Sequence, residues 1–501
     1  MSCLKGRVYR MREWIKANAG KTYKNFINGE WIESVSGKTS VLYESAIPTN
    51  ELGHFPDSVI EDVNLAVEAA DKAFQQWKNT PGTTRASVLY RFADLLEANV
   101  EELAYILSAE QGKVLAESRG EVKRAATEAR FSAGEAMRMD GAIMPSENPE
   151  IQTQVKRYPI GVIAAIAPWN FPVVTPVRKV APAIAYGCTV VLKPASVTPW
   201  STIRLMELLA EAGLPNGVVN LVIGSGSKVG DPLVSHPLVK GISFTGSTAL
   251  GLRINEIAAS KLAKTQLELG GKNAAVVLDY DNLEYAADQI VSAAFAVSGQ
   301  RCTAISRVIV LQDQANSLVE ILKTKMENIL VGPAWEENVT MGPVINRQQF
   351  DSVMDYIELG KKEGAELVYG GERLQVGEKE EGYYIQPTLF TKVNKTMRIA
   401  KEEIFGPVLV VMEASDVAEA IELANATDYG LAVSVFTNQL DVSHDISDKI
   451  DTGMVHINHG TASQAHVPFG GVKQSGFGAY SIGHSNQEFF TSMKAVYVKP
   501  R

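Results

Sequence analysis

Residues 161–192 read GVIAAIAPWNFPVVTPVRKVAPAIAYGCTVVL, and this stretch predicts the fold. Its first six residues form an uninterrupted apolar run of the kind that becomes a buried strand. A helix is expected to follow and to stop at Gly187, because glycine tolerates the left-handed conformation that closes helices. Residues 189–192 then form a second apolar strand. This order predicts two parallel strands joined by a crossover helix.

The same alternation continues towards the C-terminus. A helix is expected over residues 198–212, ending before Gly213, and another through Ile257. Three further strands are expected at residues 218–223, 241–244 and 265–268. Continuous apolar strands that alternate with helices are typical of a parallel sheet covered on both faces, which is a nucleotide-binding architecture.

A second alternating region begins with an apolar strand at residues 274–278 and runs to about Phe477. Its first helix carries Ala286, Ile290 and Ala294 at the spacing of a core-facing stripe. The chain is therefore predicted to be an α/β protein with two parallel-sheet regions.

The first 160 residues are organised differently. Residues 26–32 predict a β-hairpin with Asn28-Gly29 as its turn, and residues 59–132 show a helical periodicity. The basic N-terminal segment is predicted to be a solvated amphipathic helix, since no apolar core of a secretory signal follows it. Residues 151–159 and 494–498 alternate in polarity and are expected to be extended arms.

The composition is that of a multidomain globular protein. The chain has 501 residues, of which 46% are hydrophobic and 21% are charged. The net charge of −9 argues against a nucleic-acid partner, and no apolar stretch is long enough to predict a membrane span.

Cysteine and histidine usage predicts neither disulfides nor a metal site. The three cysteines are Cys3, Cys188 and Cys302. They form no disulfide framework and no Cys-x-x-Cys motif, and they suit a reducing cytoplasm. His456, His459 and His466 form a loose group for which packing within a loop is the preferred interpretation.

One cysteine and one carboxylate stand in segments that suggest chemistry. Cys302 follows Gly299-Gln300-Arg301 after a helical run, and Glu268 ends a predicted strand before Gly270-Gly271. A thiolate is a nucleophile, and a carboxylate can activate water as a base. The alternatives are a buried structural cysteine and an ion-paired or helix-capping carboxylate.

Seven motifs, in order along nearly the whole chain, resemble those of the aldehyde dehydrogenase superfamily. They are Pro168-Trp169-Asn170-Phe171-Pro172, Lys193-Pro194-Ala195-Ser196, Phe244-Thr245-Gly246-Ser247-Thr248, Glu268-Leu269-Gly270-Gly271-Lys272, Gly299-Gln300-Arg301-Cys302, Glu403-Ile404-Phe405-Gly406-Pro407 and Pro468-Phe469-Gly470-Gly471. Each motif alone is weak, but the ordered set is very specific. The motifs are most similar to those of succinate-semialdehyde and 2,5-dioxovalerate dehydrogenases.

The resemblance implies a division of the chain. Residues 1–138 and 160–268 would form a Rossmann-like cofactor-binding domain, and residues 269–479 a catalytic domain. Residues 139–159 and 480–501 would form the oligomerisation arm of a homodimer or homotetramer.

The resemblance also assigns four residues to catalysis. Cys302 attacks the aldehyde carbon as a thiolate, and Asn170 binds the resulting oxyanion together with the backbone N–H of Cys302. Glu268 activates the water that hydrolyses the thioester. Lys179 lies near the oxyanion and the cofactor ribose. A turn-shaping role for Asn170 and a surface position for Lys179 are the alternatives.

A nicotinamide cofactor site is implied in the same way. The helix that opens after Gly246 offers backbone N–H groups to a pyrophosphate, with Ser247 against a phosphate. Trp169 lines the adenosine-side channel, and Glu403 with Phe405 holds the nicotinamide ribose and ring, although Phe405 has core packing as its alternative. The other implied cofactor contacts are Ile166, Lys193, Ser196, Gly226, Gly230, Leu250 and Leu269.

Ser196 bears on the choice of cofactor. NAD-selective relatives often carry a glutamate at this position, which accepts from the ribose 2′-OH and repels a 2′-phosphate. Serine removes that repulsion, and Lys193 supplies positive charge. We therefore predict NADP as the preferred cofactor, with NAD also usable.

Two arginines predict an aldehyde with an anionic tail, such as succinate semialdehyde, 2,5-dioxovalerate or sulfolactaldehyde. Arg178 stands where succinate-semialdehyde dehydrogenases bind the substrate carboxylate, and Arg301 adjoins the nucleophile. A guanidinium binds carboxylate, phosphate or sulfonate in a bidentate fork. Ser463 and Gln464 are expected to add polar contacts. Alternatively, Arg178 pairs with an acidic neighbour and Arg301 faces the cofactor or solvent.

Two positions depart from the family pattern. Ala296 stands where the succinate-semialdehyde enzymes have a further arginine. Gly478 is followed by Ala479 and Tyr480 where many relatives have Arg-Glu, so a second carboxylate for proton relay is missing. Glu268 is left as the main candidate base.

Three other functions remain open at this point. They are a broad-specificity dehydrogenase of neutral aldehydes, an acylating dehydrogenase that passes the thioester to coenzyme A, and an inactive structural homologue. Acylating enzymes often lack a base like Glu268, and an inactive homologue would be free to lose Cys302, Glu268 or Asn170. The presence of all three residues favours an active aldehyde dehydrogenase.

Overall fold

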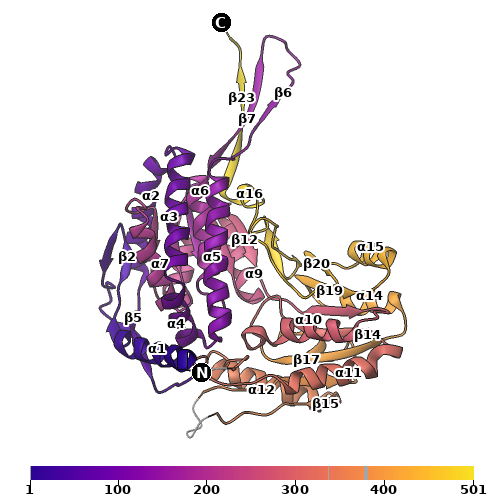
Figure 1. Cartoon of the computed structure of the whole chain (residues 1–501). Helices are drawn as coiled ribbons and strands as arrows, with labels where there is room; N and C mark the ends of the chain where they lie inside the picture. The colour runs from indigo at the N-terminus through magenta and orange to yellow at the C-terminus, as the bar shows by residue number, and fades with distance from the viewer. Residues whose placement is uncertain (1, 337, 377–381, 501) are drawn as a thin grey trace.

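The computed structural model describes residues 2–336, 338–376 and 382–500, which form two large sheets and a projecting arm (Figure 1). The predicted unit at residues 161–192 is present as β8, α6 and β9, with parallel β8 and β9 in register from Val162–Thr189 to Ile166–Lys193. In spatial order the first sheet contains β22 (Gly476–Gly478), β12 (Lys264–Glu268), β11 (Val239–Thr245), β8 (Val162–Ile166), β9 (Thr189–Lys193), β10 (Val219–Leu221), β2 (Asn25–Ile27) and β3 (Glu30–Ile32).

The outer strands of this sheet are antiparallel to their neighbours, whereas the five central strands are parallel. The predicted hairpin at residues 26–32 supplies β2 and β3. Asn28 and Gly29 have φ values of 53° and 84°, which a type I′ turn requires.

Helices cover both faces of the first sheet, as predicted. One face packs against α1 (Ser2–Asn18), α3 (Gly82–Ala98), α4 (Val100–Gln111), α5 (Leu115–Glu135), α6 (Val174–Tyr186) and α7 (Trp200–Glu211). The other face packs against α2 (Ile60–Trp77), α8 (Asp231–Ser235) and α9 (Thr248–Ser260). As expected, α6 closes at Gly187, whose φ is 85°.

The second sheet has seven strands and a parallel centre. In spatial order they are β15 (Glu366–Tyr369), β16 (Thr388–Thr391), β17 (Val408–Ala414), β14 (Ile305–Leu311), β13 (Asn273–Val277), β19 (Ala432–Phe436) and β20 (Met454–Ile457). Its faces are covered by α10 (Leu283–Phe295) and α11 (Gln312–Glu327), and by α12 (Arg347–Lys362), α13 (Arg398–Lys401), α14 (Val417–Asn425) and α15 (Leu440–Lys449). The predicted stripe of Ala286, Ile290 and Ala294 is buried in this core.

The arm is a three-stranded antiparallel sheet that projects from the body (Figure 1). β7 (Gln152–Pro159) pairs along its whole length with β23 (Thr491–Val498), and β6 (Ala142–Met144) adds a third strand. The smaller elements are β1 (Lys21–Thr22), β4 (Thr39–Tyr43), β5 (Glu51–Pro56), β18 (Tyr429–Gly430), β21 (Val472–Lys473), α16 (Asn486–Phe490), the π-helix η1 (Gly226–Gly230) and the 3₁₀-helix η2 (Ala296–Gly299). No helix of the described residues combines the length and apolarity that a membrane crossing needs.

The helical periodicity at residues 59–132 is confirmed as four helices, and Gly112, with φ 94°, closes the third. Two local predictions need correction. The N-terminal helix is not simply solvated, because Met11 and Ile15 are buried in the core. The C-terminal arm strand begins at Thr491 and is longer than predicted, because it pairs with the whole of β7.

The candidate functional site lies where the two large sheets meet. The loops after β8, β11 and β12, at the carboxyl ends of the first sheet, face residues that immediately precede β14 and β17 of the second sheet. Strands β8 and β11 are neighbours although α6, β9 and β10 lie between them in sequence, so the strand order reverses there. Ligands of open α/β sheets bind in the crevice at such a reversal.

Candidate active site

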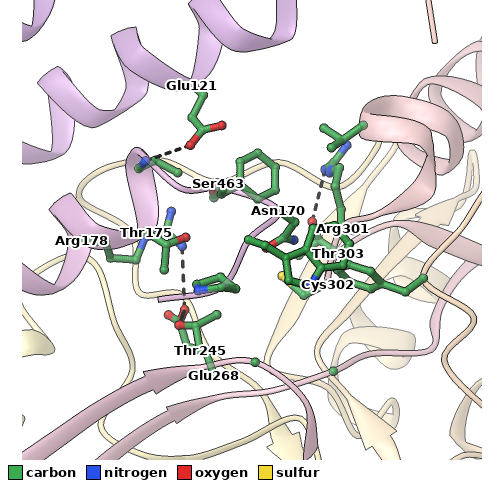
Figure 2. Close-up of a pocket in the computed structure, with 18 of the residues that line it drawn as sticks. Glu121, Asn170, Thr175, Arg178, Thr245, Glu268, Arg301, Cys302, Thr303 and Ser463 are labelled. Atoms are coloured by element: carbon green, nitrogen blue, oxygen red, sulfur yellow. Dashed lines mark hydrogen bonds and ion pairs between the residues drawn. The ribbon is translucent and has the colours of Figure 1, made fainter. Parts of the chain in front are cut away.

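A cavity of about 540 Å³ lies where the two sheets meet (Figure 2). The first sheet contributes Trp169, Asn170, Thr245, Ser247, Glu268 and Leu269, and the second region contributes Arg301, Cys302, Glu403, Phe405 and Ser463. Glu117, Glu121, Arg124 and Arg178 line it from α5 and α6. Eleven predicted site residues are thus placed in or at one cavity: Asn170, Glu268, Cys302, Trp169, Ser247, Leu269, Glu403, Phe405, Arg178, Arg301 and Ser463.

Cys302 follows an unusual backbone turn. Val297 and Ser298, in η2, have φ values of 55° and 56°, a left-handed conformation that is rare for residues with a side chain. The carbonyl of Cys302 accepts a hydrogen bond from Nδ2 of Asn273 at 2.7 Å. This anchors the nucleophile to the first residue of β13.

The thiol of Cys302 is protonated in the resting site. Burial, together with the charges of Glu268 and Glu403, raises its pKa to about 12, against the opposing effect of Arg178 and Arg301. For Cys302 to act as a nucleophile, a base must therefore accept this proton.

Asn170 lies on the loop after β8 and is buried. Its Nδ2 donates to the carbonyl of Gln300 at 2.9 Å, and this is the one hydrogen bond that the amide donates within the described chain. The second N–H of the amide is thus left for a group in the cavity. This geometry suits an oxyanion donor beside Cys302.

Glu268 ends β12 with its carboxylate in the cavity. Oε2 accepts a hydrogen bond from Oγ1 of Thr245 at 3.0 Å and lies 4.0 Å from Nη1 of Arg178. Oε1 is buried and has no partner among the described residues. An acceptor left open in this way is suited to take a proton from a thiol or a water molecule.

Lys179 is buried rather than at the surface, which excludes the alternative of a solvated lysine. It does not line the cavity itself but lies behind Thr245, where Nζ donates to Thr245 Oγ1 at 2.8 Å and to Ser243 Oγ at 3.1 Å. Burial lowers the pKa of Lys179 to about 8. Its connection to Glu268 runs through the Thr245 hydroxyl. Thr245 belongs to a motif, but the sequence alone assigns it no role. Its pairing with Glu268 across β11 and β12 places its hydroxyl between Lys179 and Glu268.

The two predicted substrate arginines differ in their surroundings. Arg178 is engaged by Glu128, with its Nε and Nη2 at 3.1 and 2.9 Å from the two carboxylate oxygens, which is the alternative that the sequence left open. Arg301 makes no ion pair within the described residues. Its Nη2 donates to Thr303 Oγ1 at 3.2 Å and to the carbonyl of Thr461 at 3.5 Å.

Arg124 is a cavity residue that the sequence analysis missed. It lines the cavity from α5, donates to the carbonyl of Ser463 at 2.6 Å, and pairs with Glu128 at 2.8 Å. The four-residue spacing of Arg124 and Glu128 indicates a helical ion pair, but nothing in the sequence directs it towards the cavity. Ser463 lines the cavity, whereas Gln464 does not.

The nicotinamide end of the predicted cofactor site is well formed. The rings of Trp169 and Phe405 pack edge to face at 5.2 Å. Oε1 of Glu403 accepts from the backbone N–H of Gly271 at 3.0 Å, and burial raises the pKa of Glu403 to about 7. A Cβ atom at Gly270 would clash with the carboxylate of Glu403, so a larger residue there would displace this carboxylate.

The anion-binding end fits a dinucleotide as well. Ser247 precedes the first turn of α9 and makes no side-chain capping bond, which leaves backbone N–H groups open towards the cavity. The remaining predicted contacts lie outside the cavity itself: Ile166, Lys193, Ser196, Gly226, Gly230 and Leu250.

Two of these outlying residues form a local cluster. Ser196 Oγ donates to the carbonyl of Gly224 at 3.0 Å. Lys193 Nζ donates to the carbonyl of Pro194 at 2.9 Å, and a Cβ at Gly230 would lie 3.7 Å from Lys193. Lys228, which was given no role beforehand, stands on η1 in the same region and pairs with Asp57 at 2.6 Å.

The histidines are not arranged as metal ligands. His456 lies in β20 and its ring packs edge to face on His459 at 5.0 Å. Among the described residues, no three histidine, cysteine or acidic side chains come together as a metal-binding group.

Comparisons with known proteins agree with this geometry. The sequence profile described as "Aldehyde dehydrogenase family" matches residues 31–496. The alpha-ketoglutaric semialdehyde dehydrogenase of Bacillus subtilis (strain 168) is 42% identical over 480 residues, covering 96% of this chain and 98% of that protein. The betaine aldehyde dehydrogenase of Staphylococcus aureus in complex with NAD⁺ superposes with a TM-score of 0.94 at 32% identity, covering 99% and 98% of the two chains. An NADP-dependent enzyme of E. coli gives a TM-score of 0.93 at 34% identity, covering 97% and 99%.

The raised pKa of Cys302 predicts a specific pH dependence. Alkylation of Cys302 by iodoacetamide in cofactor-free protein should rise about tenfold per pH unit between about pH 7 and pH 9, because only the thiolate reacts. Intact-mass spectrometry measures the rate, and a Cys302→Ser variant provides the correction for labelling of Cys3 and Cys188. A rate that is already constant near pH 7 would mean that the resting thiol is ionised.

Proposed function

Because the chain belongs to the aldehyde dehydrogenase family, we propose that it oxidises a semialdehyde with an anionic tail to the carboxylic acid, with transfer of a hydride to NADP or NAD. The observation that supports the anionic tail is Arg301, a cavity cation with no carboxylate partner within the described residues. The B. subtilis relative is named for a semialdehyde of this kind.

The first step is attack of Cys302 on the aldehyde carbon. Glu268 accepts the thiol proton through its open Oε1, and a carbon–sulfur bond forms while the carbonyl oxygen takes the negative charge. The free N–H of the Asn170 amide and the backbone N–H of Cys302 bind that oxyanion. Such donors together contribute about 10²–10³ or more to the rate, because they are oriented before the charge develops.

Oxidation and hydrolysis then complete the cycle. When bound, the nicotinamide cofactor accepts the hydride that leaves the former aldehyde carbon. The residues that would hold it are Trp169, Ser247, Glu403 and Phe405. Glu268 first gives up the thiol proton to solvent. It then takes a proton from the water molecule that attacks the thioester carbon, the carbon–sulfur bond breaks, and the acid leaves as the Cys302 sulfur is reprotonated. Thr245 and Lys179 keep the Glu268 carboxylate oriented during this step.

The charge of the cavity supports the substrate class. Glu128 balances Arg178 and Arg124, whereas Arg301 has no ion pair among the described residues. A partly buried cation without an ion-pair partner is costly, and an anionic substrate group would relieve that cost. Arg301 is therefore the residue that we expect to bind the tail.

The arm extends the proposal to assembly as a homodimer or homotetramer. β6 is an edge strand, and its Ile143 side chain is 88% exposed. On β23, Met493 is 66% exposed and Tyr497 is 73% exposed. Apolar side chains on an open sheet edge favour pairing with a second copy.

Replacement of Arg301 tests the substrate class. Arg301→Gln should raise the KM for succinate semialdehyde and for 2,5-dioxovalerate about 10–100-fold, because a hydrogen bond between charged groups is lost. The KM for butanal should change less than about threefold. Arg130→Gln, which alters a surface arginine of α5, is the matched control. An equal rise for charged and neutral aldehydes would favour a broad-specificity dehydrogenase instead.

The NADP preference rests on the absence of a carboxylate at Ser196 and on the nearby cation of Lys193. Ser196→Glu should raise the KM for NADP about tenfold or more and that for NAD by less than about threefold, because a carboxylate repels the 2′-phosphate. Initial rates with each cofactor measure this. Equal effects on the two cofactors would remove Ser196 from the selectivity determinants.

A further inference from the structure

Residues at the start of α5 contact both the loop that carries Asn170 and the turn that precedes Cys302. Lys113, between α4 and α5, and Glu121, within α5, form an ion pair of 2.5 Å whose side chains are 0% and 1% exposed. An ion pair removed from water in this way rarely adds net stability, since desolvation offsets the attraction. Its presence beside the cavity therefore needs another explanation, and the remaining contacts of the two residues provide one.

The lysine holds the loop that carries the oxyanion donor. Nζ of Lys113 donates to the backbone carbonyl of Asn170 at 2.7 Å and lies 4.3 Å from the centre of the Phe171 ring. The peptide on the C-terminal side of Asn170 is thus fixed by a buried ammonium group. A displacement of this peptide would move the side-chain amide of Asn170 with it.

Glu121 binds the backbone of the residues that follow this loop. Oε1 of Glu121 accepts hydrogen bonds from the backbone N–H groups of Val173 at 2.8 Å and Val174 at 3.0 Å. These are the first N–H groups of α6, which have no partner within the helix. Glu121 therefore sets where α6 begins, and Lys113 neutralises the buried charge that this requires.

Glu117, a second glutamate of α5, contacts the turn that precedes Cys302. Oε1 of Glu117 accepts from the backbone N–H of Val297 at 2.8 Å. Val297 is β-branched and left-handed, with φ 55°, a conformation that persists only where its surroundings impose it. The turn that it starts leads to Gln300, whose carbonyl accepts the Asn170 amide, and then to Cys302.

We propose that Lys113, Glu117 and Glu121 form an oxyanion brace, a set of positioning residues that aligns the Asn170 amide with the backbone N–H of Cys302. The brace rests on the proposed function, because it acts through the oxyanion role of Asn170. It predicts that loss of Lys113 slows catalysis only while the Asn170 amide is present.

A double-mutant cycle tests this prediction. Asn170→Ala should lower kcat about 10²–10³-fold, and Lys113→Met should lower it about tenfold or more, with the KM for NADP changed less than about twofold. The double variant should be no slower than Asn170→Ala within about twofold. Factors that multiply in the double variant, or a normal kcat for Lys113→Met, would overturn the brace. A normal kcat for Asn170→Ala would instead refute the oxyanion role in the proposed function.

A matched pair of glutamates separates positioning from folding. Glu110 of α4 is buried and accepts from the backbone N–H groups of Trp200 at 2.9 Å and Ser201 at 3.1 Å, as Glu121 does for α6, but away from the cavity. Glu110→Gln should lower the thermal midpoint and leave kcat unchanged. Glu121→Gln should lower kcat about tenfold, and it also serves if Lys113→Met fails to fold. Equal kcat values for the two glutamine variants would overturn the proposal.

Discussion

The hydrogen bond from Nδ2 of Asn170 to the carbonyl of Gln300 joins the two large sheets at the point where chemistry takes place. One partner follows the central strand of the first sheet, and the other lies two residues before the nucleophile. Since neither sheet alone contains both Glu268 and Cys302, the reaction depends on the registration of one sheet against the other. A shift of about 1 Å at this junction would misplace the Asn170 amide, which we propose as an oxyanion donor.

Charged groups in the cavity are balanced by neighbours of opposite charge, because an unpaired ion away from water costs free energy. Burial keeps the thiol of Cys302 protonated, and Glu268 and Glu403 add to that effect while Arg178 and Arg301 oppose it. Glu128 shares its carboxylate between Arg124 and Arg178. Among the described residues, Arg301 is the cavity arginine without an ion pair. In the function that we propose, a substrate with a negative tail completes this balance on binding, so that the electrostatics of the site select the substrate.

Much of the fold could be predicted from sequence because the strand and helix signals are local. The apolar run at residues 161–166 and the glycine at Gly187 are sufficient to define the unit β8–α6–β9, and the turn at Asn28-Gly29 defines a hairpin. The burial of Met11 could not be predicted, because it depends on what the N-terminal helix packs against. Likewise, the positions of Arg124 and of the Lys113–Glu121 pair at the cavity could not be predicted, because their partners lie about 50 to 340 residues away in the sequence. The pairing of Arg178 with Glu128 needed the packing of α5 on α6 to be known.

The proposed reaction depends most directly on covalent chemistry at Cys302 followed by hydrolysis that needs Glu268. The decisive measurement is a rapid-mixing experiment on Glu268→Gln with NADP and succinate semialdehyde, combined with intact-mass analysis of the quenched protein. We expect one equivalent of NADPH per site in a first phase that is slower than in the unmodified protein, because the Cys302 thiol has lost its base, and an acyl adduct on Cys302 that outlasts this phase. Steady-state turnover should then be about 10²–10⁴-fold slower than in the unmodified protein. Unchanged turnover, or the absence of both the first phase and the adduct, would contradict the proposed mechanism.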